Sequence, residues 1–152
     1  MIRKGSAADV PFMRSMLAHA YAWRVNAFEA DIRLSRYVDN WGRPGDLALI
    51  AHETGNHIGA AWLRLFRAAE PGYGFVDENT PELSIAVVPS RRRHGLGQEL
   101  MDALLDAARG AGHGSLSLSV ENDSPAVAFY ERNGFERVRE QDAGLVMQKR
   151  LT

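Results

Sequence analysis

Two glycines at the end of a basic stretch are the feature of the sequence with the clearest chemical meaning. Residues 86–97 read Ala-Val-Val-Pro-Ser-Arg-Arg-Arg-His-Gly-Leu-Gly, so an apolar run ends at a proline and Gly95 and Gly97 open the next segment. The first turn of a helix has unpaired backbone N–H groups, and its dipole favours negative charge. Glycines let an anion approach that backbone without meeting a Cβ atom. The stretch therefore predicts an anion site, with residues 91–94 adding positive charge beside it.

The glycine spacing by itself does not identify the anion. It matches neither the dinucleotide-binding fingerprint nor a P-loop, because the second half of each motif is missing. A glycine-bearing helix start near arginines is also common in proteins that bind no phosphate. The side chains of 91–93 could equally face water.

A second stretch further along the chain makes the interpretation specific. Residues 124–135 read Ser-Pro-Ala-Val-Ala-Phe-Tyr-Glu-Arg-Asn-Gly-Phe. Together the two stretches resemble the acyl-CoA signature and the second motif of the GNAT N-acetyltransferase superfamily, with Arg92, Gly95 and Gly97 at fixed positions of the signature. The resemblance covers nearly the whole chain and is strongest over 82–135.

The resemblance implies a division of labour in binding acetyl-CoA, the expected acyl donor. Backbone N–H groups of 93–98 would hold the pyrophosphate, and the strand at 86–88 would splay and pair with the pantetheine arm. The amide of Val87 or Val88 would polarise the thioester carbonyl. The residues expected at the cosubstrate are Ala86, Val87, Val88, Arg92, Arg93, His94, Gly95, Leu96, Gly97, Gln98, Ser124, Ala126, Phe129 and Tyr130.

Tyr130 is the candidate general acid. Helical spacing puts it on one stripe with Ala126, Phe129 and Asn133. In the family, a tyrosine at this position points at the sulfur of coenzyme A and can protonate the departing thiolate. A phenol with a pKa of about 10 suits that task. The alternative is an aromatic core residue beside Phe129.

Glu82 is the candidate general base. Alternation along 82–88 puts Glu82 on the same face as Ala86, whereas Leu83 and Val87 point the other way. In histone-type relatives a similarly placed glutamate takes the proton of the acceptor amine through water. Since Glu82 and Ala86 are about 13 Å apart along the strand, only a water chain could serve. An exposed carboxylate at the start of the strand, or an anchor for the substrate ammonium, explains Glu82 equally well.

The sequence does not identify the acceptor. In the family its pocket comes from the first helices and, here, from the loop 70–81. Trp62 could line that pocket or belong to the core, and Asp77 and Glu78 could attract a cationic amine or simply be solvated. The chain has five histidines without metal-ligand spacing, so we expect no metal site: His19, His52, His57, His94 and His113.

The hydrophobic pattern predicts the elements that position these residues. Ser6 would cap a helix over 10–21, with Asp9 in its first turn. The further elements are an amphipathic piece over 28–38, strands over 47–52 and 58–66 around a turn at 54–56, a strand over 82–88, a helix over 96–109, a strand with one buried face over 115–120, a helix from Ser124-Pro125 to Asn133-Gly134, and a final hairpin of 135–139 and 145–151. The expected fold is α/β, a GNAT-like mixed twisted sheet flanked by helices in the order β-α-α-β-β-β-α-β-α-β-β.

Length and composition limit the other functions to consider. The 152 residues fit one domain, 1–152. A net charge of −1 argues against nucleic acid or an acidic membrane as a partner. The chain has no cysteine, so it can form no cysteine-linked acyl-enzyme, and this supports direct transfer in a ternary complex.

We expect a soluble cytoplasmic N-acyltransferase that acts on a small-molecule or peptide amine. The alternatives are a non-catalytic acyl-CoA-sensing or partner-binding module and a nucleic-acid patch at 91–94. A homodimer is one expected assembly, since relatives are often dimers.

Overall fold

The fold is built around one mixed sheet. The computed structural model describes residues 1–21, 34–91, 95–141 and 144–151. In this part of the chain seven strands pair in the order β1-β2-β3-β4-β5-β7-β6. The strands are β1 (Ile2–Lys4), β2 (Leu47–Glu53), β3 (Asn56–Arg64), β4 (Glu82–Val87), β5 (Ser115–Glu121), β6 (Glu136–Gln141) and β7 (Gly144–Arg150). The α-helices are α1 (Val10–Ala20), α3 (Leu96–Gly110) and α4 (Ala126–Arg132), and short 3₁₀ helices cover Ala7–Asp9, Ser35–Tyr37 and Pro89–Arg91.

This order agrees with the predicted one wherever the structure describes the chain. Of the amphipathic piece expected over 28–38, residues 28–33 lie outside the described residues, and Ser35–Tyr37 is a 3₁₀ helix. The turn of the last hairpin, 142–143, also lies outside them, but β6 and β7 pair in antiparallel fashion as predicted. Thr54-Gly55 joins β2 and β3 as a two-residue turn, because Glu53 lies opposite Asn56.

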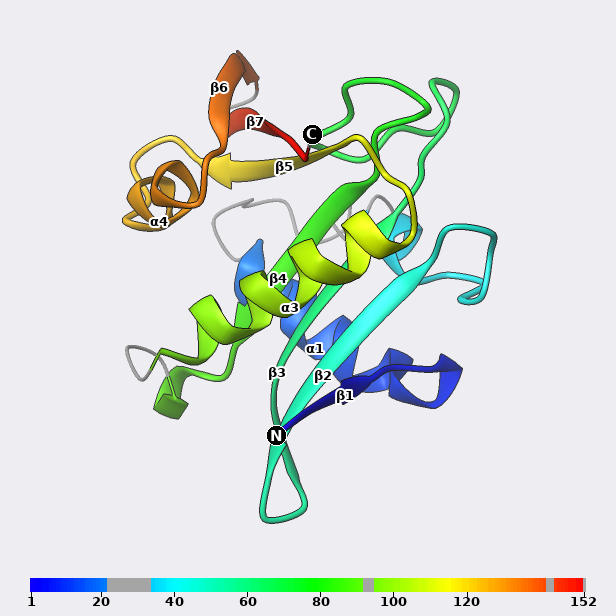
Figure 1. Cartoon of the computed structure of the whole chain (residues 1–152), viewed down its shortest axis with the longest axis vertical. Coiled ribbons are helices and arrows are strands. Elements are labelled where there is room, and N and C mark those ends of the chain that lie inside the picture. Colours follow the sequence, from blue (N-terminus) through cyan, green and yellow to red (C-terminus); the bar gives the residue numbers. More distant parts are fainter. Residues whose placement is uncertain (22–33, 92–94, 142–143, 152) are drawn as a thin grey trace.

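Helices cover both faces of the sheet. α3 packs on one face in a core that includes Leu83 and Leu100, and α1 packs on the other in a core that includes Met13 and Trp62. Figure 1 shows α3 in front of the sheet and α1 behind it. The predicted stripe of α3 is confirmed, since its members are all buried: Leu96, Leu100, Leu104 and Ala108. We call the two sides the α3 face and the α1 face.

The chemistry expected at the helix ends is present in part. Ser6 caps the 3₁₀ helix Ala7–Asp9 and not α1, whose N-cap residue is Asp9, which corrects the prediction. The Ser6 amide donates to Asp9 Oδ2 at 2.9 Å. Ser124 Oγ accepts from the Ala126 amide at 3.1 Å, so it caps α4 as predicted, although the helix begins at Ala126. α4 ends at Arg132, before Asn133-Gly134. No helix in the described part of the chain is long and apolar enough to span a membrane.

β5 is buried on both faces at Ser117, which corrects the prediction of one buried face at that position, while Ser115 and Ser119 are half-buried. Leu116 and Leu118 lie in the core of the α3 face, as the alternation predicts. Ser117, on the other face, is fully buried as well. The small serine is covered because the loop before β4 packs on this strand: a Cβ on Gly74 would meet the backbone of Leu118.

The two halves of the sheet join at a single parallel pair. Glu82, the first residue of β4, lies opposite Ser117 of β5, and the described residues contain no further pair between these strands. Figure 1 shows β4 and β5 leaving this point and diverging. This is the splay that the resemblance implied for 86–88. We call the diverging edges the β4/β5 split and the Glu82–Ser117 pair its apex.

Candidate functional site

The start of α3 has the open glycine that an anion site requires. Gly95 is the N-cap residue, with φ of 80° in the left-handed region, and a Cβ there would meet no atom of the described residues within 4 Å. The first helical amides that follow it have no acceptor within the helix. Residues 92–94, where Arg92, Arg93 and His94 were expected to contribute, lie outside the described residues.

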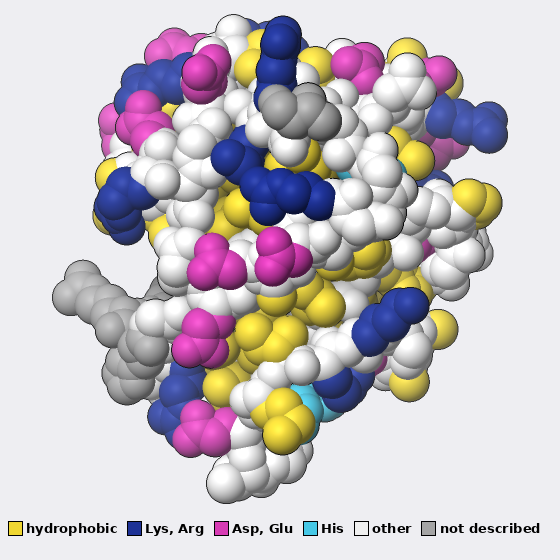
Figure 2. Space-filling model, in the orientation of Figure 1, with side chains coloured by type: hydrophobic (Ala, Val, Ile, Leu, Met, Phe, Trp, Pro, Cys, Tyr) yellow, Lys and Arg dark blue, Asp and Glu magenta, His cyan; other side chains and the backbone are white. Residues whose placement is uncertain are grey.

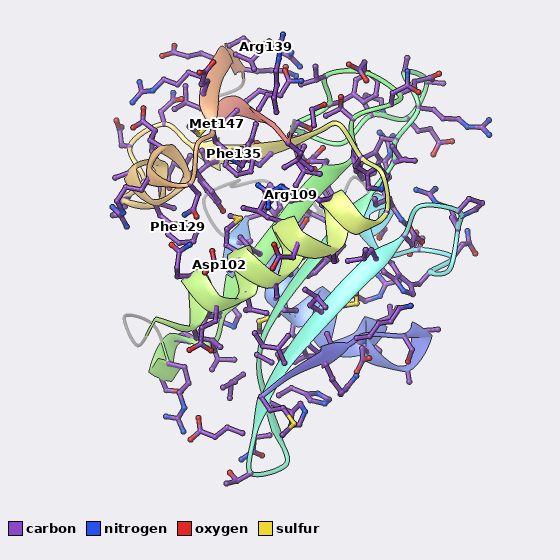
Figure 3. All side chains as sticks on the ribbon, in the orientation of Figure 1. Asp102, Arg109, Phe129, Phe135, Arg139 and Met147 are labelled. Atoms are coloured by element: carbon purple, nitrogen blue, oxygen red, sulfur yellow. The ribbon has the colours of Figure 1, made fainter. Side chains whose placement is uncertain are left out.

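The two sequence motifs meet at this helix start. Gln98 Nε2 donates to Asn133 Oδ1 at 2.7 Å, and Asn133 Nδ2 donates back to Gln98 Oε1 at 3.2 Å. A Cβ on Gly97 would lie 3.9 Å from the ring of Phe129. Figure 3 shows Phe129 on α4, near the start of α3. The first turn of α3 and the last turn of α4 therefore border the same region, as the resemblance implied.

A cavity beside the same helix start carries mixed charge. It has a volume of about 350 Å³ and is lined by Met1, Glu53, Ile58, Arg91, Leu96 and Glu99. Two carboxylates border it, and its cationic groups are already engaged: Arg91 pairs with Glu53 at 3.2 Å, and the Met1 ammonium donates to the His52 carbonyl at 3.0 Å. Asp102 and Asp106 are exposed on α3, and Figure 2 shows acidic side chains over this helix. The open backbone at Gly95 suits an anion better than this cavity does.

The backbone of β4 directs alternate amides to the two sides of the strand. The Val88 amide donates to the Ile58 carbonyl on the β3 side at 2.9 Å. Val88 is therefore turned away from the split and is not the amide that meets a thioester there. Val87 lies opposite Gly59, the next pair along the antiparallel ladder. Hydrogen-bonded and non-hydrogen-bonded pairs alternate in such a ladder, so the Val87 N–H points away from β3, to the β5 side. Of the two candidates, the geometry favours Val87.

Tyr130 lies in an apolar setting on the α3 face. It is 8% exposed and packs edge-on against Phe129 and Phe135, at ring-centroid distances of 5.4 and 5.9 Å. Phe135 lies beside Met147 at the end of the sheet (Figure 3). Burial raises the pKa of Tyr130 above its ordinary value, so the phenol keeps its proton. Its hydroxyl makes no hydrogen bond within the described ranges.

Glu82 lies on the α1 face, at the apex of the split, and it is 1% exposed. The interpretation as an exposed carboxylate is therefore wrong. Its Oε2 accepts a hydrogen bond from the Tyr37 hydroxyl, and its Oε1 accepts from the Gly74 amide at 3.1 Å. Ser84 and Ser117 lie beside it on this face, and their buried hydroxyls have no hydrogen-bond partner among the described residues.

The remaining sequence candidates have structural roles. Trp62 is 1% exposed and its Nε1 donates to the Tyr37 carbonyl, so it is a core residue and not part of a pocket wall. Asp77 and Glu78 are exposed and accept hydrogen bonds from the nearby Asn79 and Ala68 amides. They stabilise their own loop, which favours the interpretation of a solvated segment. The described residues contain no group of His, Asp and Glu that could hold a metal ion.

Sequence reasoning missed Tyr37, Tyr73 and Gly72, which enclose Glu82. The Tyr73 amide donates to the Tyr37 hydroxyl at 2.8 Å. Gly72 packs so closely that a Cβ there would collide with Glu82 Oε1. The pattern Gly-Tyr-Gly shortly before Glu82 was the available signal, since paired glycines often mark a close backbone approach. Nothing in the residues around Tyr37 indicates its partner.

Three comparisons identify relatives of this arrangement. Residues 12–135 match the model of the Acetyltransferase (GNAT) family. A mycothiol acetyltransferase from Clavibacter sepedonicus is 30% identical over 139 residues, which is 90% of this chain but only 40% of that protein. The chain thus spans less than half the length of this curated relative.

Solved structures share the fold at low sequence identity. The ribosomal-protein-alanine N-acetyltransferase from Brucella melitensis superposes with a TM-score of 0.70 at 24% identity, over 99% of each chain. The yncA protein from Salmonella typhimurium, solved with acetyl-CoA, has a TM-score of 0.72 at 24% identity, over 100% of this chain and 94% of its own. The paiA N-acetyltransferase from Thermoplasma acidophilum, solved with coenzyme A, has a TM-score of 0.72 at 18% identity, over 99% and 98%. Because the family model matches residues 12–135, which is most of the chain, the chain belongs to the GNAT acetyltransferase family.

Proposed function

We propose that this protein transfers the acetyl group of acetyl-CoA to a primary amine, by direct attack in a ternary complex. The observation that carries the proposal is the β4/β5 split. Its apex is the Glu82–Ser117 pair, and at its open end the chain continues from β4 to the accessible helix start at Gly95. A long cosubstrate with a phosphate at one end and a thioester at the other fits such a path. Acetyl-CoA, the cosubstrate expected from the sequence, has this form, and the yncA structure holds it.

Coenzyme A binds along the open edge of β4 in this proposal. Its pyrophosphate lies at the first turn of α3, where Gly95 leaves the backbone accessible. Its pantetheine arm then extends along β4 and pairs with the strand backbone. The Val87 amide points to this edge and polarises the thioester carbonyl. The reacting carbon consequently lies inside the split, between the two faces of the sheet.

The acid and the base work from opposite faces. Tyr130 belongs to the core of the α3 face, and Glu82 contacts Tyr37 in the core of the α1 face. The donor thus has its proton source on one face, while the acceptor enters from the other. Because Glu82 is buried, a water must link it to the amine. The hydroxyls of Ser84 and Ser117 offer that water hydrogen-bond partners.

The proton balance of the reaction follows from these roles. An acceptor ammonium gives one proton to Glu82 through water, and the neutral nitrogen then attacks the thioester carbon. The C–N bond forms and the C–S bond breaks, while Tyr130 gives its proton to the departing sulfur. The nitrogen loses a second proton, which replaces the one that Tyr130 gave. The products are an amide, coenzyme A thiol and one proton released to water.

A thiol-release assay over a panel of amines tests this function. The panel contains aminothiols, amino acids, polyamines and peptides with a free N-terminal alanine, since similar proteins include a mycothiol and a ribosomal-protein-alanine acetyltransferase. We expect amine-dependent release of coenzyme A, with an acetylated product detected by mass spectrometry. Tight binding of acetyl-CoA without turnover on any amine would favour the non-catalytic module instead.

A further inference from the structure

The carboxylate of Glu82 is held by the hydroxyl of a buried tyrosine. Tyr37 is fully buried, and its hydroxyl oxygen accepts a hydrogen bond from the Tyr73 amide at 2.8 Å. The Tyr21 hydroxyl donates to the same oxygen at 3.4 Å. With these two bonds accepted, the one proton of Tyr37 is directed to Glu82 Oε2. Burial and the neighbouring Glu82 raise the pKa of Tyr37 well above its ordinary value, so it remains a donor.

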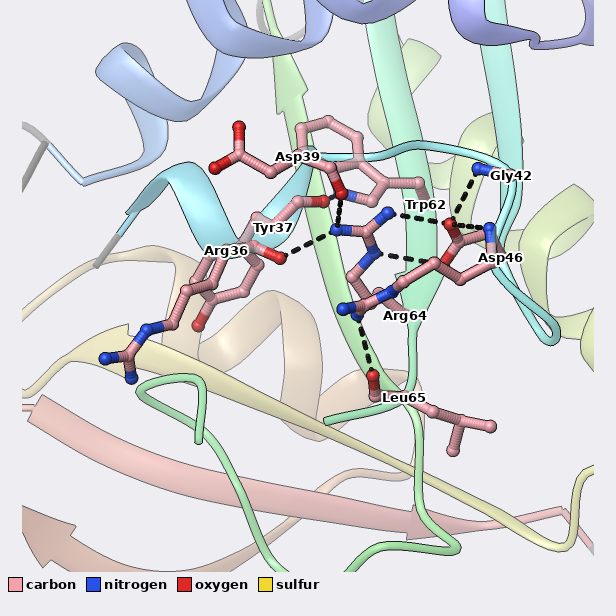
Figure 4. A network of polar contacts seen from close by, with 9 residues as sticks. Arg36, Tyr37, Asp39, Gly42, Asp46, Trp62, Arg64 and Leu65 are labelled. Atoms are coloured by element: carbon pink, nitrogen blue, oxygen red, sulfur yellow. Dashed lines mark hydrogen bonds and ion pairs between the residues drawn. The ribbon is translucent and has the colours of Figure 1, made fainter. Parts of the chain in front are cut away.

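Two side chains of β3 fix the backbone that carries Tyr37. Trp62 Nε1 donates to the Tyr37 carbonyl at 3.1 Å. Arg64 Nη1 donates to the carbonyls of Arg36 and Asp39, at 2.9 and 2.6 Å. Three carbonyls within Arg36–Asp39 are thus held by two side chains, as Figure 4 shows. The segment cannot shift along the sheet without breaking all of these bonds.

Arg64 is itself locked in place. Its Nε and Nη2 form a two-point ion pair with Asp46, at 3.0 and 2.7 Å, and both side chains are 1% exposed. Its guanidinium lies 5.2 Å from the ring centroid of Trp41. Four of its five N–H groups donate to the carboxylate and to the two backbone carbonyls, which leaves the arginine one orientation. Figure 4 shows it at the centre of the network.

The sheet register places Trp62 and Arg64 next to the carboxylate of Glu82. Arg64 lies directly opposite Glu82 on the neighbouring strand, and Trp62 lies opposite Ser84. Directly opposite residues of an antiparallel pair share a face. Trp62 and Arg64, which hold the segment Arg36–Asp39, therefore lie on the α1 face beside Glu82, the carboxylate to which Tyr37 donates.

We propose that Tyr37, anchored by Trp62 and Arg64, is a positioning residue that holds the carboxylate of Glu82 at the apex of the split as the proton acceptor for the amine. This inference rests on the proposed acetyl transfer. One donor on each oxygen fixes the carboxylate plane and stabilises its ionised form. Among the described residues, the titratable and charged groups near Glu82 include Tyr37, its neighbours Tyr21 and Tyr73, Arg64 on the opposite strand, and Asp46, which pairs with Arg64.

The pH dependence of kcat/KM for the acceptor amine, in wild type and Tyr37→Phe, tests the proposal. Removing the hydroxyl takes one donor from the ionised carboxylate, so we expect the acidic limb of the profile to move to higher pH by about one unit. We also expect kcat to fall while KM for acetyl-CoA stays unchanged. Tyr21→Phe is the matched control: it removes a buried hydroxyl that touches Tyr37, whereas the hydroxyl that donates to Glu82 Oε2 belongs to Tyr37, and its profile should follow the wild type.

Trp62→Phe provides a second variant in case Tyr37→Phe does not fold. It keeps an aromatic ring but removes the donor to the Tyr37 carbonyl, and we expect a shift of the acidic limb in the same direction. If the folded variants lose thermal stability but keep the wild-type profile, Tyr37 is only structural and the proposal is wrong. Full activity in Glu82→Gln would instead overturn the role of Glu82 as base. No turnover in the wild type with any amine would overturn the proposed function and this inference together.

Discussion

Tyr130 and Glu82, which we propose as acid and base, are both buried but have different surroundings. Tyr130 lies among apolar rings, and burial raises its pKa, so it keeps a proton until a strong base approaches. A departing thiolate is such a base. Glu82 is just as buried but accepts hydrogen bonds on both oxygens, which stabilises the ionised carboxylate. The difference comes from the hydrogen-bond donors around each group, a tyrosine hydroxyl and a backbone amide at Glu82, and not from depth in the protein.

At this scale the first prediction concerns Tyr130→Phe. We expect kcat to fall by about 100-fold, because proton donation by a positioned side chain contributes at least that much. The dissociation constant of acetyl-CoA should change little, since the aromatic ring stays in place. The melting temperature should also stay near the wild-type value, because the hydroxyl makes no hydrogen bond within the described residues. Steady-state kinetics and calorimetric titration measure these quantities, and an undiminished kcat would remove Tyr130 from the mechanism.

Helix α3 carries the proposed phosphate site at its first turn, and much of this element could be predicted from the sequence. The stripe that starts at Leu96 fixes which side of the helix faces the sheet, and this fixes where Gly95 opens. The segment Arg36–Asp39 could not be predicted in the same way. Its position depends on side chains of β3 that bond its backbone carbonyls, and such contacts leave no periodic pattern in the sequence.

A prediction for this element compares two glycines at the ends of the same helix. Gly95 has φ of 80° and Gly112 has φ of 85°, and neither has an atom within 4 Å of a built Cβ. Valine at either position meets a similar backbone strain, about 1–3 kcal/mol. We expect Gly95→Val to weaken acetyl-CoA binding at least about tenfold, because its side chain would occupy the proposed anion site. Gly112→Val should lose similar stability but keep its affinity, and equal affinities in calorimetric titration would argue against the phosphate position.

A second prediction at this scale concerns the Arg64–Asp46 pair. Replacing Asp46 with alanine leaves a buried guanidinium without its carboxylate, so we expect a loss of about 3–5 kcal/mol in the free energy of unfolding. The Arg14–Asp39 pair is the control, since its side chains are 50% and 48% exposed. Arg14→Ala should therefore cost about 0.5 kcal/mol or less. Urea unfolding measures both, and similar losses would mean that the buried pair does not hold the segment.

At the scale of the whole molecule, prediction from the sequence had two sources. Hydrophobic periodicity indicated the helices and strands, including the long α3 and the β2–β3 hairpin. The divergence of β4 from β5 was predicted from the family resemblance alone. No local sequence pattern shows that two strands will pair at one residue only. The burial of Ser117 was missed for a related reason: the loop that covers it is distant in sequence.

The whole fold should lose stability in alkaline solution. Tyr37 and Tyr130 both have pKa values raised by burial, whereas tyrosines in the unfolded chain ionise near pH 10. Above that pH the unfolded state binds fewer protons than the folded state, so stability falls as pH rises. Each of the two tyrosines contributes a slope of about 1.4 kcal/mol per pH unit between the unfolded and folded pKa values. Urea unfolding between pH 8 and 11 measures the slope, and a flat profile above about pH 10 would contradict the protonated buried phenols.

Thermal unfolding with acetyl-CoA, coenzyme A and ATP tests the central claim most directly. A ligand present at about 100 times its dissociation constant adds roughly 2.7 kcal/mol to the free energy of unfolding, which is roughly 5–10 °C for a domain of this size. We expect that increase in melting temperature with acetyl-CoA and with coenzyme A. ATP, which has the adenosine and phosphates but no pantetheine arm to pair with β4, should produce little change. No shift with either coenzyme A species would contradict the account, because the β4/β5 split would then not be a cosubstrate site.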